Sequence, residues 1–205
     1  SVLEPPQLPP YVASVTVTNK EVINIVDPAG KRFSGSTKKS SGVLLGPITV
    51  NEGIVLTQFQ VVEDMQSTVD GGTCEVKISG ETCSCSLLDT APDAGIALLR
   101  VTCQESSRTN INRQVSRPIV LQIPPGGITA DSTVYSYGFS AGGAQVSTSR
   151  GRLSYKNAYG LGLNAIAGGP IVSFDQKQDG QARGGPVLTE SGQFLGVTVS
   201  SQDCQ

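Results

Sequence analysis

The sequence predicts an all-β protein built from two small antiparallel barrels that pack together. Short runs rich in Val, Ile, Leu and Thr recur at close spacing, and Gly, Pro, Asn and Asp separate them. No segment keeps a sustained 3.6-residue period, and only residues 60–65 show one turn of helical pattern. The runs fall into two groups of about six, which is typical of paired β-barrels.

The N-terminal half contains an arm and the first predicted barrel. Residues 1–10 (SVLEPPQLPP) hold four of the twelve prolines, and proline fixes φ and cannot donate to a sheet. We therefore expect an extended arm there, or alternatively a proline-rich ligand for a partner's groove. The first barrel is expected over 11–104, with strands in the runs 12–18, 41–46, 53–58, 74–79, 86–89 and 96–101.

A polar stretch then interrupts the pattern, and we interpret residues 105–117 as a connector. The second barrel is expected over 118–205. Its runs are 118–123, 133–139, 145–155, 170–175, 186–190 and 193–200, the last two joined by a Ser191-Gly192 turn. The run 145–155 alternates and predicts one long strand with a solvent-facing side.

Composition excludes several classes of chemistry. The chain contains no histidine, so no Ser–His or Cys–His dyad and no His-containing zinc site can form within it. The net charge of −2 gives no general attraction to phosphate, so no nucleic-acid partner is expected, and the pair Lys38-Lys39 is interpreted as a solvated face. No apolar run approaches the ~20 residues of a membrane helix. No cofactor is expected.

The sequence holds five cysteines: Cys74, Cys83, Cys85, Cys103 and Cys204. The spacing Cys83-x-Cys85 is too tight for a common zinc knuckle, which favours disulfides over reduced buried thiols or a metal site. If residues 74–85 form a hairpin turning at 79–80, Cys74 and Cys85 are equidistant from the turn and face each other. Cys83 would share the face of Cys85 and could reach Cys103. Disulfides favour an extracytoplasmic compartment: secreted, periplasmic or the thylakoid lumen.

Four segments, in collinear order, resemble the trypsin-like serine proteases of the chymotrypsin fold, and most of all their Deg/HtrA type. They are SGVLLGPITVNEGIVLTQFQVVED (41–64), APDAGIALLRV (91–101), VYSYGFSAGGAQVSTSRGRLS (134–154) and SFDQKQDGQARGGPVLTESGQFLGV (173–197). The resemblance implies two six-stranded antiparallel barrels. Only five residues follow Ser200, so no PDZ domain is expected after the second barrel.

The resemblance also assigns positions to the family's catalytic residues. The general-base histidine falls on Gln60, the orienting aspartate on Gly95 and the nucleophile on Arg183. An amide cannot take and return a proton at useful pH, glycine has no side chain, and a guanidinium is permanently cationic. The resemblance thus implies a catalytically inactive pseudoprotease, with residues 183–185 (Arg-Gly-Gly) as the candidate remnant of a substrate groove. The glycine expected two positions before the nucleophile is Gln181.

A second Gly-Gly-Pro at 168–170 offers a rival alignment with Ala167 in the nucleophile position. We prefer the later copy because Asp175 keeps the family's spacing to Arg183 and because a hairpin follows. Neither alignment supplies a serine nucleophile. Arg183 itself could fill the old substrate pocket, pair with a partner's carboxylate, or simply face solvent.

The function predicted from these observations is that of an interaction or structural subunit with protein partners, within a larger, membrane-associated assembly. One alternative is a peptide-binding module that keeps a substrate groove without cutting. Another is a hydrolase with a Ser/Lys mechanism, which needs no histidine. Cys204 is assigned no role.

Overall fold

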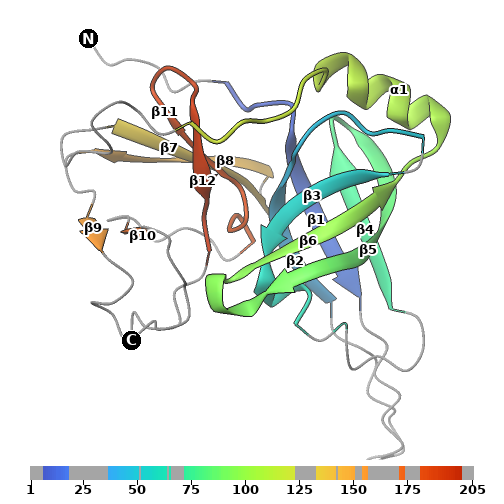
Figure 1. Ribbon diagram of the computed structural model, residues 1–205, viewed down its shortest axis with the longest axis horizontal. Helices are drawn as coiled ribbons and strands as arrows, with labels where there is room; N and C mark the ends of the chain where they lie inside the picture. The colour runs from blue at the N-terminus through green and yellow to red at the C-terminus, as the bar shows by residue number, and fades with distance from the viewer. Residues whose placement is uncertain are drawn as a thin grey trace, which may run out of the picture.

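The computed structural model describes residues 7–18, 37–50, 52–63, 65, 72–122, 133–141, 143–150, 154–156, 171–173 and 181–199 (Figure 1). Their strands form a closed six-stranded barrel, a four-stranded sheet and a two-stranded sheet. The fold is therefore mostly β, and the predicted barrel in the N-terminal half is confirmed. The four-stranded sheet is not closed, so the described residues do not show a second barrel.

The barrel is antiparallel, with strand order β1-β2-β3-β6-β5-β4, and β4 pairs back onto β1. Its strands are β1 (Val12–Thr18), β2 (Thr37–Leu44), β3 (Gly53–Gln58), β4 (Thr73–Ile78), β5 (Glu81–Ala91) and β6 (Ile96–Thr102). Alternate side chains point inward because a strand has a two-residue period. Small β-branched residues such as Val15, Val55 and Val101 are fully buried and fill this narrow interior.

The C-terminal half contributes the strands β7 (Thr133–Ser140), β8 (Gly143–Arg150), β11 (Pro186–Thr189) and β12 (Phe194–Val197), in the order β12-β11-β7-β8. The short strands β9 (Ser154–Lys156) and β10 (Ile171–Ser173) pair with each other. The predicted long strand over 145–155 corresponds to β8 and β9, and residues 151–153 between them lie outside the described part. The predicted strand over 118–123 is wrong in its described part, where only Leu121 forms an isolated bridge, to Phe194.

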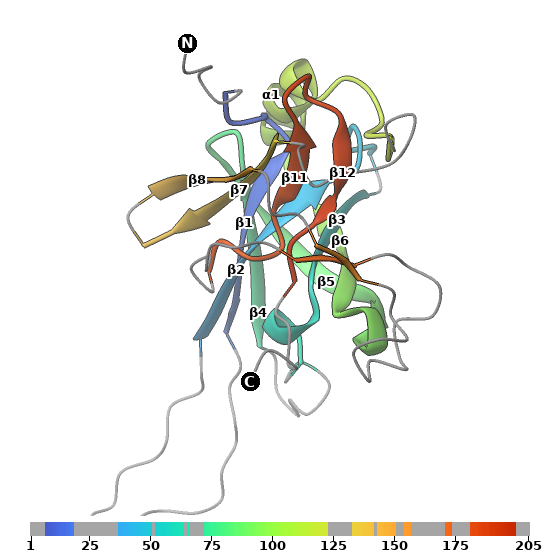
Figure 2. The ribbon, with the colours of Figure 1, turned by 90° about the vertical axis from the view of Figure 1, so that its left-hand side faces the viewer.

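The barrel and the four-stranded sheet share an apolar interface. β7 runs beside β1 and β2 (Figures 1 and 2). The buried side chains of this interface are Val12, Val43, Tyr135, Tyr137, Leu188 and Phe194. Burial, and after it the neighbouring Tyr135, raises the pKa of Tyr137 to about 12. The shift means that ionising this phenol would be unfavourable in its buried position.

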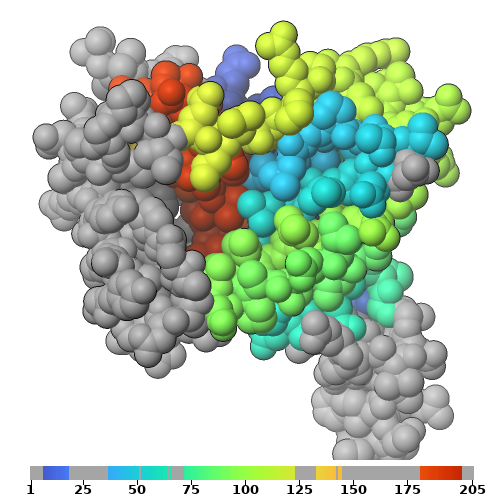
Figure 3. Space-filling view, in the orientation of Figure 1, coloured from blue at the N-terminus to red at the C-terminus, as the bar shows by residue number. Residues whose placement is uncertain are grey.

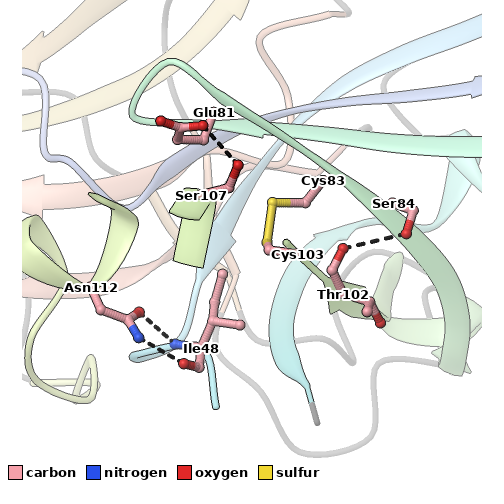
Figure 4. Close-up of a disulfide and its surroundings, with 8 residues drawn as sticks. All are labelled: Ile48, Glu81, Cys83, Ser84, Thr102, Cys103, Ser107 and Asn112. Carbon is pink, nitrogen blue, oxygen red and sulfur yellow. Dashed lines mark hydrogen bonds between the residues drawn. A yellow bond between two sulfur atoms is a disulfide. The ribbon is translucent and has the colours of Figure 1, made fainter. Parts of the chain in front are cut away.

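The predicted connector contains the helix α1 (Glu105–Gln114), which the sequence analysis missed. The helix has no broad apolar stripe, and only its Ile111 is fully buried. Side-chain hydrogen bonds hold it instead: the Asn112 amide donates to Ile48 O (2.7 Å) and accepts from Ile48 N (2.8 Å) (Figure 4). Such polar anchoring leaves no hydrophobic period in the sequence. Among the described residues, no helix is long and apolar enough to cross a membrane.

Glu81 ties the same helix to the β4–β5 hairpin. Its carboxylate accepts hydrogen bonds from the Asn110 amide (2.7 Å) and the Ser107 hydroxyl (2.8 Å). These two bonds lower the pKa of Glu81 below its ordinary value. A carboxyl whose pKa is lower in the folded state stabilises that state at a pH above its unfolded pKa. The contribution is lost as the pH falls through the folded pKa.

We expect Glu81→Gln to reduce the difference in melting temperature between neutral and acidic solution, because the variant has no carboxyl to protonate at this position. Thermal unfolding followed by circular dichroism between about pH 7 and pH 3 measures it. Glu75→Gln is the matched control, since Glu75 lies exposed on β4 of the same hairpin. An unchanged acid dependence in Glu81→Gln would show that the helix anchor does not titrate.

Both predicted disulfides are present. Cys74 bonds to Cys85, and Cys83 bonds to Cys103, with Cα–Cα distances of 4.9 and 4.7 Å. The β4–β5 register pairs Glu75 with Ser84, which makes Cys74 and Cys85 opposite residues, as predicted from the turn at 79–80. These four cysteines are therefore neither free thiols nor metal ligands. Cys204 lies outside the described residues.

Candidate functional site

The turn at residues 181–184 lies where the barrel meets the four-stranded sheet. Ser41 N, in β2, donates to Arg183 O (2.9 Å). On the other side, Gly184 N donates to Thr198 O (2.7 Å) and Thr198 N donates to Gly185 O (3.0 Å). The backbone of the turn is thus hydrogen-bonded both to the barrel and to the segment that follows β12.

Buried hydroxyl groups fix the turn further. Ser40 Oγ donates to Arg183 O (2.7 Å), and Ser41 Oγ donates to Gln181 O (2.9 Å) while accepting from Phe139 N (2.8 Å). Thr57 Oγ1 donates to Ser41 O (2.7 Å). Ser40, Ser41 and Thr57 are all at most 1 % exposed. Since buried polar groups are costly unless paired, this network favours one conformation of the turn.

We expect Ser41→Ala to lower the free energy of unfolding by about 2 kcal/mol, because Phe139 N–H and Gln181 C=O would both lose a buried partner. Denaturation with urea measures the change. Ser84→Ala serves as the control, since Ser84 is exposed and its hydroxyl donates only to Thr102 O at 3.3 Å. A loss in Ser41→Ala no larger than in the control would mean that the network does not hold the turn.

The Gly184-Gly185 pair is required by packing. Gly184 has φ +94°, and a Cβ there would overlap Ser41 O. A Cβ at Gly185 would overlap Tyr137 O of β7. Only glycine lets the two backbones approach this closely. The pair is therefore explained by the junction between barrel and sheet, whatever chemistry the site performs.

Gln60 lies in a short 3₁₀ helix, Phe59–Val61, directly after β3. Gln60 is half-buried, and its backbone carbonyl oxygen accepts a hydrogen bond from Lys38 Nζ (3.4 Å). The preceding Phe59 N donates to Gly95 O (2.8 Å). The positions assigned to the base and to the orienting acid are therefore on adjacent backbone segments.

Gly95 ends a second 3₁₀ helix, Pro92–Ala94, with φ 71° and ψ 20°. This is the left-handed region of backbone conformation, which residues other than Gly, Asn and Asp rarely adopt. An added Cβ would lie 3.4 Å from Cβ of Val199, which is ordinary contact. The position thus has room for a side chain, but its backbone conformation favours glycine.

Two of the three assigned positions, 60 and 183, contact β2. Lys38 of β2 contacts Gln60, while Ser40 and Ser41 of the same strand contact Arg183. Gly95 joins them through its bond from Phe59. The Arg183 side chain is half-buried, and no hydrogen bond or ion pair joins its guanidinium to any described residue.

The sequence predicts a solvated face at Lys38 and Lys39, and this prediction is wrong for Lys38. Lys38 is half-buried and points to Gln60 O, whereas Lys39 is exposed. The alternation of side chains along a strand was the available signal, since Lys38 shares the parity of buried Ser40. Within the described ranges, no group of three or more His, Cys, Asp and Glu residues could hold a metal ion. The rival Gly-Gly-Pro, with Ala167, and Asp175 lie outside those ranges.

Comparison with known proteins agrees with the observed fold. A family model described as a trypsin-like peptidase domain matches residues 40–197. No curated protein matches the chain. A crystal structure of Deg5 is similar with a TM-score of 0.64 and 15 % identity, over 94 % of this chain and 80 % of that one. A structure of the HtrA-type protease AlgW, in a variant solved with a decapeptide, is similar with a TM-score of 0.60 and 17 % identity. The match covers 95 % of this chain and 58 % of that one. Identities this low show a shared fold alone.

Proposed function

Because the chain belongs to the trypsin-like peptidase family, we propose that it is a member without peptidase activity, acting as an interaction or structural subunit. The observation that carries the proposal is the set of residues at the three catalytic positions: Gln60, Gly95 and Arg183. An amide, a hydrogen and a guanidinium occupy the positions of base, orienting acid and nucleophile. No histidine elsewhere in the sequence can replace the base.

The expected loss of hydrolytic rate is large. Proton transfer by a positioned base contributes about 10²–10⁴-fold to such reactions. When members of a Ser-His-Asp triad are removed, only about 10³–10⁴-fold acceleration over water remains, from binding and the oxyanion site. That remainder leaves peptide hydrolysis too slow to serve as a biological activity.

The retained architecture supports a role for the scaffold. The buried hydroxyls of Ser40, Ser41 and Thr57 and the close packing at Gly185 hold the junction although the chemistry they would serve is missing. These contacts keep the surface around the turn in one shape, which a partner protein could recognise. The proposal assigns this scaffold to binding other proteins, because it is kept where the catalytic residues are not.

The C-terminal strands would complete a second six-stranded barrel, as the family resemblance implies. The disulfides favour an extracytoplasmic site of action, and the protein partners would belong to a larger assembly that is associated with a membrane. A peptide-binding surface at residues 183–185, which binds without cutting, is compatible with the same scaffold.

A Ser/Lys hydrolase is a second candidate, which the position of Lys38 favours. Its ammonium lies 3.4 Å from Gln60 O, beside the position of the family's general base. A lysine can serve as base only if its pKa falls toward neutrality, and it needs a serine within reach. Ser40 lies two residues away on β2, but its hydroxyl donates to Arg183 O.

The two candidates are separated by one hydrolysis assay. The purified protein is incubated with casein and with an activated acyl ester, beside Lys38→Ala as the matched variant. We expect no turnover above buffer in either protein. Turnover that rises with protein concentration in the wild type and is lost in Lys38→Ala would replace the inactive assignment by the Ser/Lys mechanism. Lys39→Ala controls for the loss of a positive charge on β2.

A further inference from the structure

The outer side of the barrel carries aliphatic side chains where solvent-facing residues are expected. On β3 and β6, inward residues such as Val55 and Leu99 are fully buried, so their neighbours in sequence point outward. Four of the outward positions hold aliphatic residues, Ile54, Leu56, Ile96 and Leu98, all half-buried and none of them packed in either apolar core. Two other outward positions hold Gln58, which is 4 % exposed, and Arg100, which is exposed. The outer surface of an antiparallel barrel in water is usually polar.

These side chains form one continuous patch with a residue of β5. Leu56 and Leu98 are direct partners across β3 and β6. On β5 the register shifts between Leu87 and Asp89, and the intervening Leu88 is 37 % exposed. We call Ile54, Leu56, Leu88, Ile96 and Leu98 the aliphatic face. In Figure 3 the cyan surface of β3 borders the green surface of β5 and β6.

The charges around the aliphatic face are unequal at its two margins. At one margin, Arg100 Nε and Glu52 Oε2 form an ion pair at 2.7 Å and neutralise each other. At the other, Asp89 lies opposite Leu98, and Asp93 follows in the next turn; both are exposed. Neither aspartate has a cationic partner among the described residues. Two carboxylates are therefore left to attract a positive group.

The dimensions of the face suit a single helix. Two residues along a strand span about 7 Å, and three neighbouring strands span about 10 Å. An α-helix is about 10 Å wide and rises about 11 Å in two turns. Aliphatic side chains at i, i+3, i+4 and i+7 of such a helix would cover the face.

We propose that the aliphatic face is a docking site for a short amphipathic helix of a partner protein, with Lys or Arg at the end that meets Asp89 and Asp93. Apolar burial supplies the affinity, and the two carboxylates orient the helix. The contact is smaller than a standard interface, so by itself it gives weak, reversible binding. The inference deepens the proposed interaction role and rests on it, but its test does not depend on whether the chain hydrolyses peptides.

The test uses a fluorescein-labelled helical peptide of about 14 residues, with leucines at i, i+3, i+4 and i+7 and lysines at one end. Titration with the full chain, followed by anisotropy, should saturate with a Kd of about 10–100 μM. Leu98→Thr, which keeps strand propensity, should weaken binding at least about tenfold. Val120→Ser is the matched control, because Val120 is 62 % exposed outside the face.

The charge component is tested without touching the aliphatic residues. Asp89→Asn with Asp93→Asn should weaken binding about three- to tenfold and reduce its dependence on salt. A peptide with glutamates in place of the lysines should bind at least about tenfold more weakly. The absence of saturable binding, or binding that Leu98→Thr and the Asp pair leave unchanged, would overturn the proposal. So would a concentration-dependent dimer that Leu98→Thr abolishes, since a second copy would then be the occupant.

Discussion

Gly185→Ala is expected to lower the free energy of unfolding by at least about 3 kcal/mol, or to prevent folding altogether. The added methyl group would overlap Tyr137 O, and this oxygen belongs to the backbone of β7. A flexible side chain could turn away, but here β11 and β7 would have to separate, and their pairing of Val187 with Ser136 would be disturbed. Urea denaturation of the purified variant measures the loss.

Gly192→Ala separates the steric effect from the general cost of replacing a glycine. Gly192 has φ +83° in the turn between β11 and β12, and an added Cβ would meet nothing within 4 Å. Replacing it by alanine should lower the free energy of unfolding by about 1–2 kcal/mol, because alanine disfavours the left-handed backbone conformation. Equal losses at the two positions would mean that the close approach of the turn to β7 is absent.

The double variant Cys83→Ala/Cys103→Ala is expected to lose about 3 kcal/mol of stability, because the disulfide closes a loop of about 20 residues in the unfolded chain. The bond joins β5 to the end of β6, immediately before α1. Chemical denaturation of the variant, with the Cys74–Cys85 bond intact, measures the change. A loss below about 1 kcal/mol would show that β5–β6 pairing alone already restricts this loop.

Reduction of the wild type provides a comparison with that variant. Cys74–Cys85 closes a shorter loop, with a sequence separation of 11. Its entropic contribution should be smaller by only about 0.5 kcal/mol, since loop closure depends on the logarithm of length. Treatment with a dithiol should therefore destabilise the wild type more than the loss of either bond alone.

Local patterns in the sequence predicted the barrel and its disulfides well. The hairpin at 79–80 has one plausible register, and that register decides which cysteines face each other. The helix α1 was not predictable in the same way, because bonds such as that between Asn112 and Ile48 join residues far apart in sequence. The predicted strand at 118–123 failed because its apolar Val120 and Leu121 remain exposed.

At the candidate site, too, the sequence predicts some features and tertiary packing decides the others. The motif around Arg183 could be placed from its neighbours, but the reason for its glycines lies in contacts with Ser41 and Tyr137. The position of Lys38 beside Gln60 and the left-handed conformation of Gly95 depend on how the strands meet. Sequence therefore locates the three positions, whereas the packing explains which residues they tolerate.

Labelling with a serine-directed fluorophosphonate reports whether the protein has an activated nucleophile, and it requires no knowledge of a substrate. The protein is incubated with the reagent beside an active trypsin-like protease, and the intact masses are measured. We predict that the active protease gains one adduct and this protein gains none. The reason is that the amide of Gln60, at the position of the general base, cannot take a proton from a nucleophile. A stoichiometric adduct on any serine of the native wild-type protein would show that the chain carries an activated nucleophile and is not an inactive member of the family.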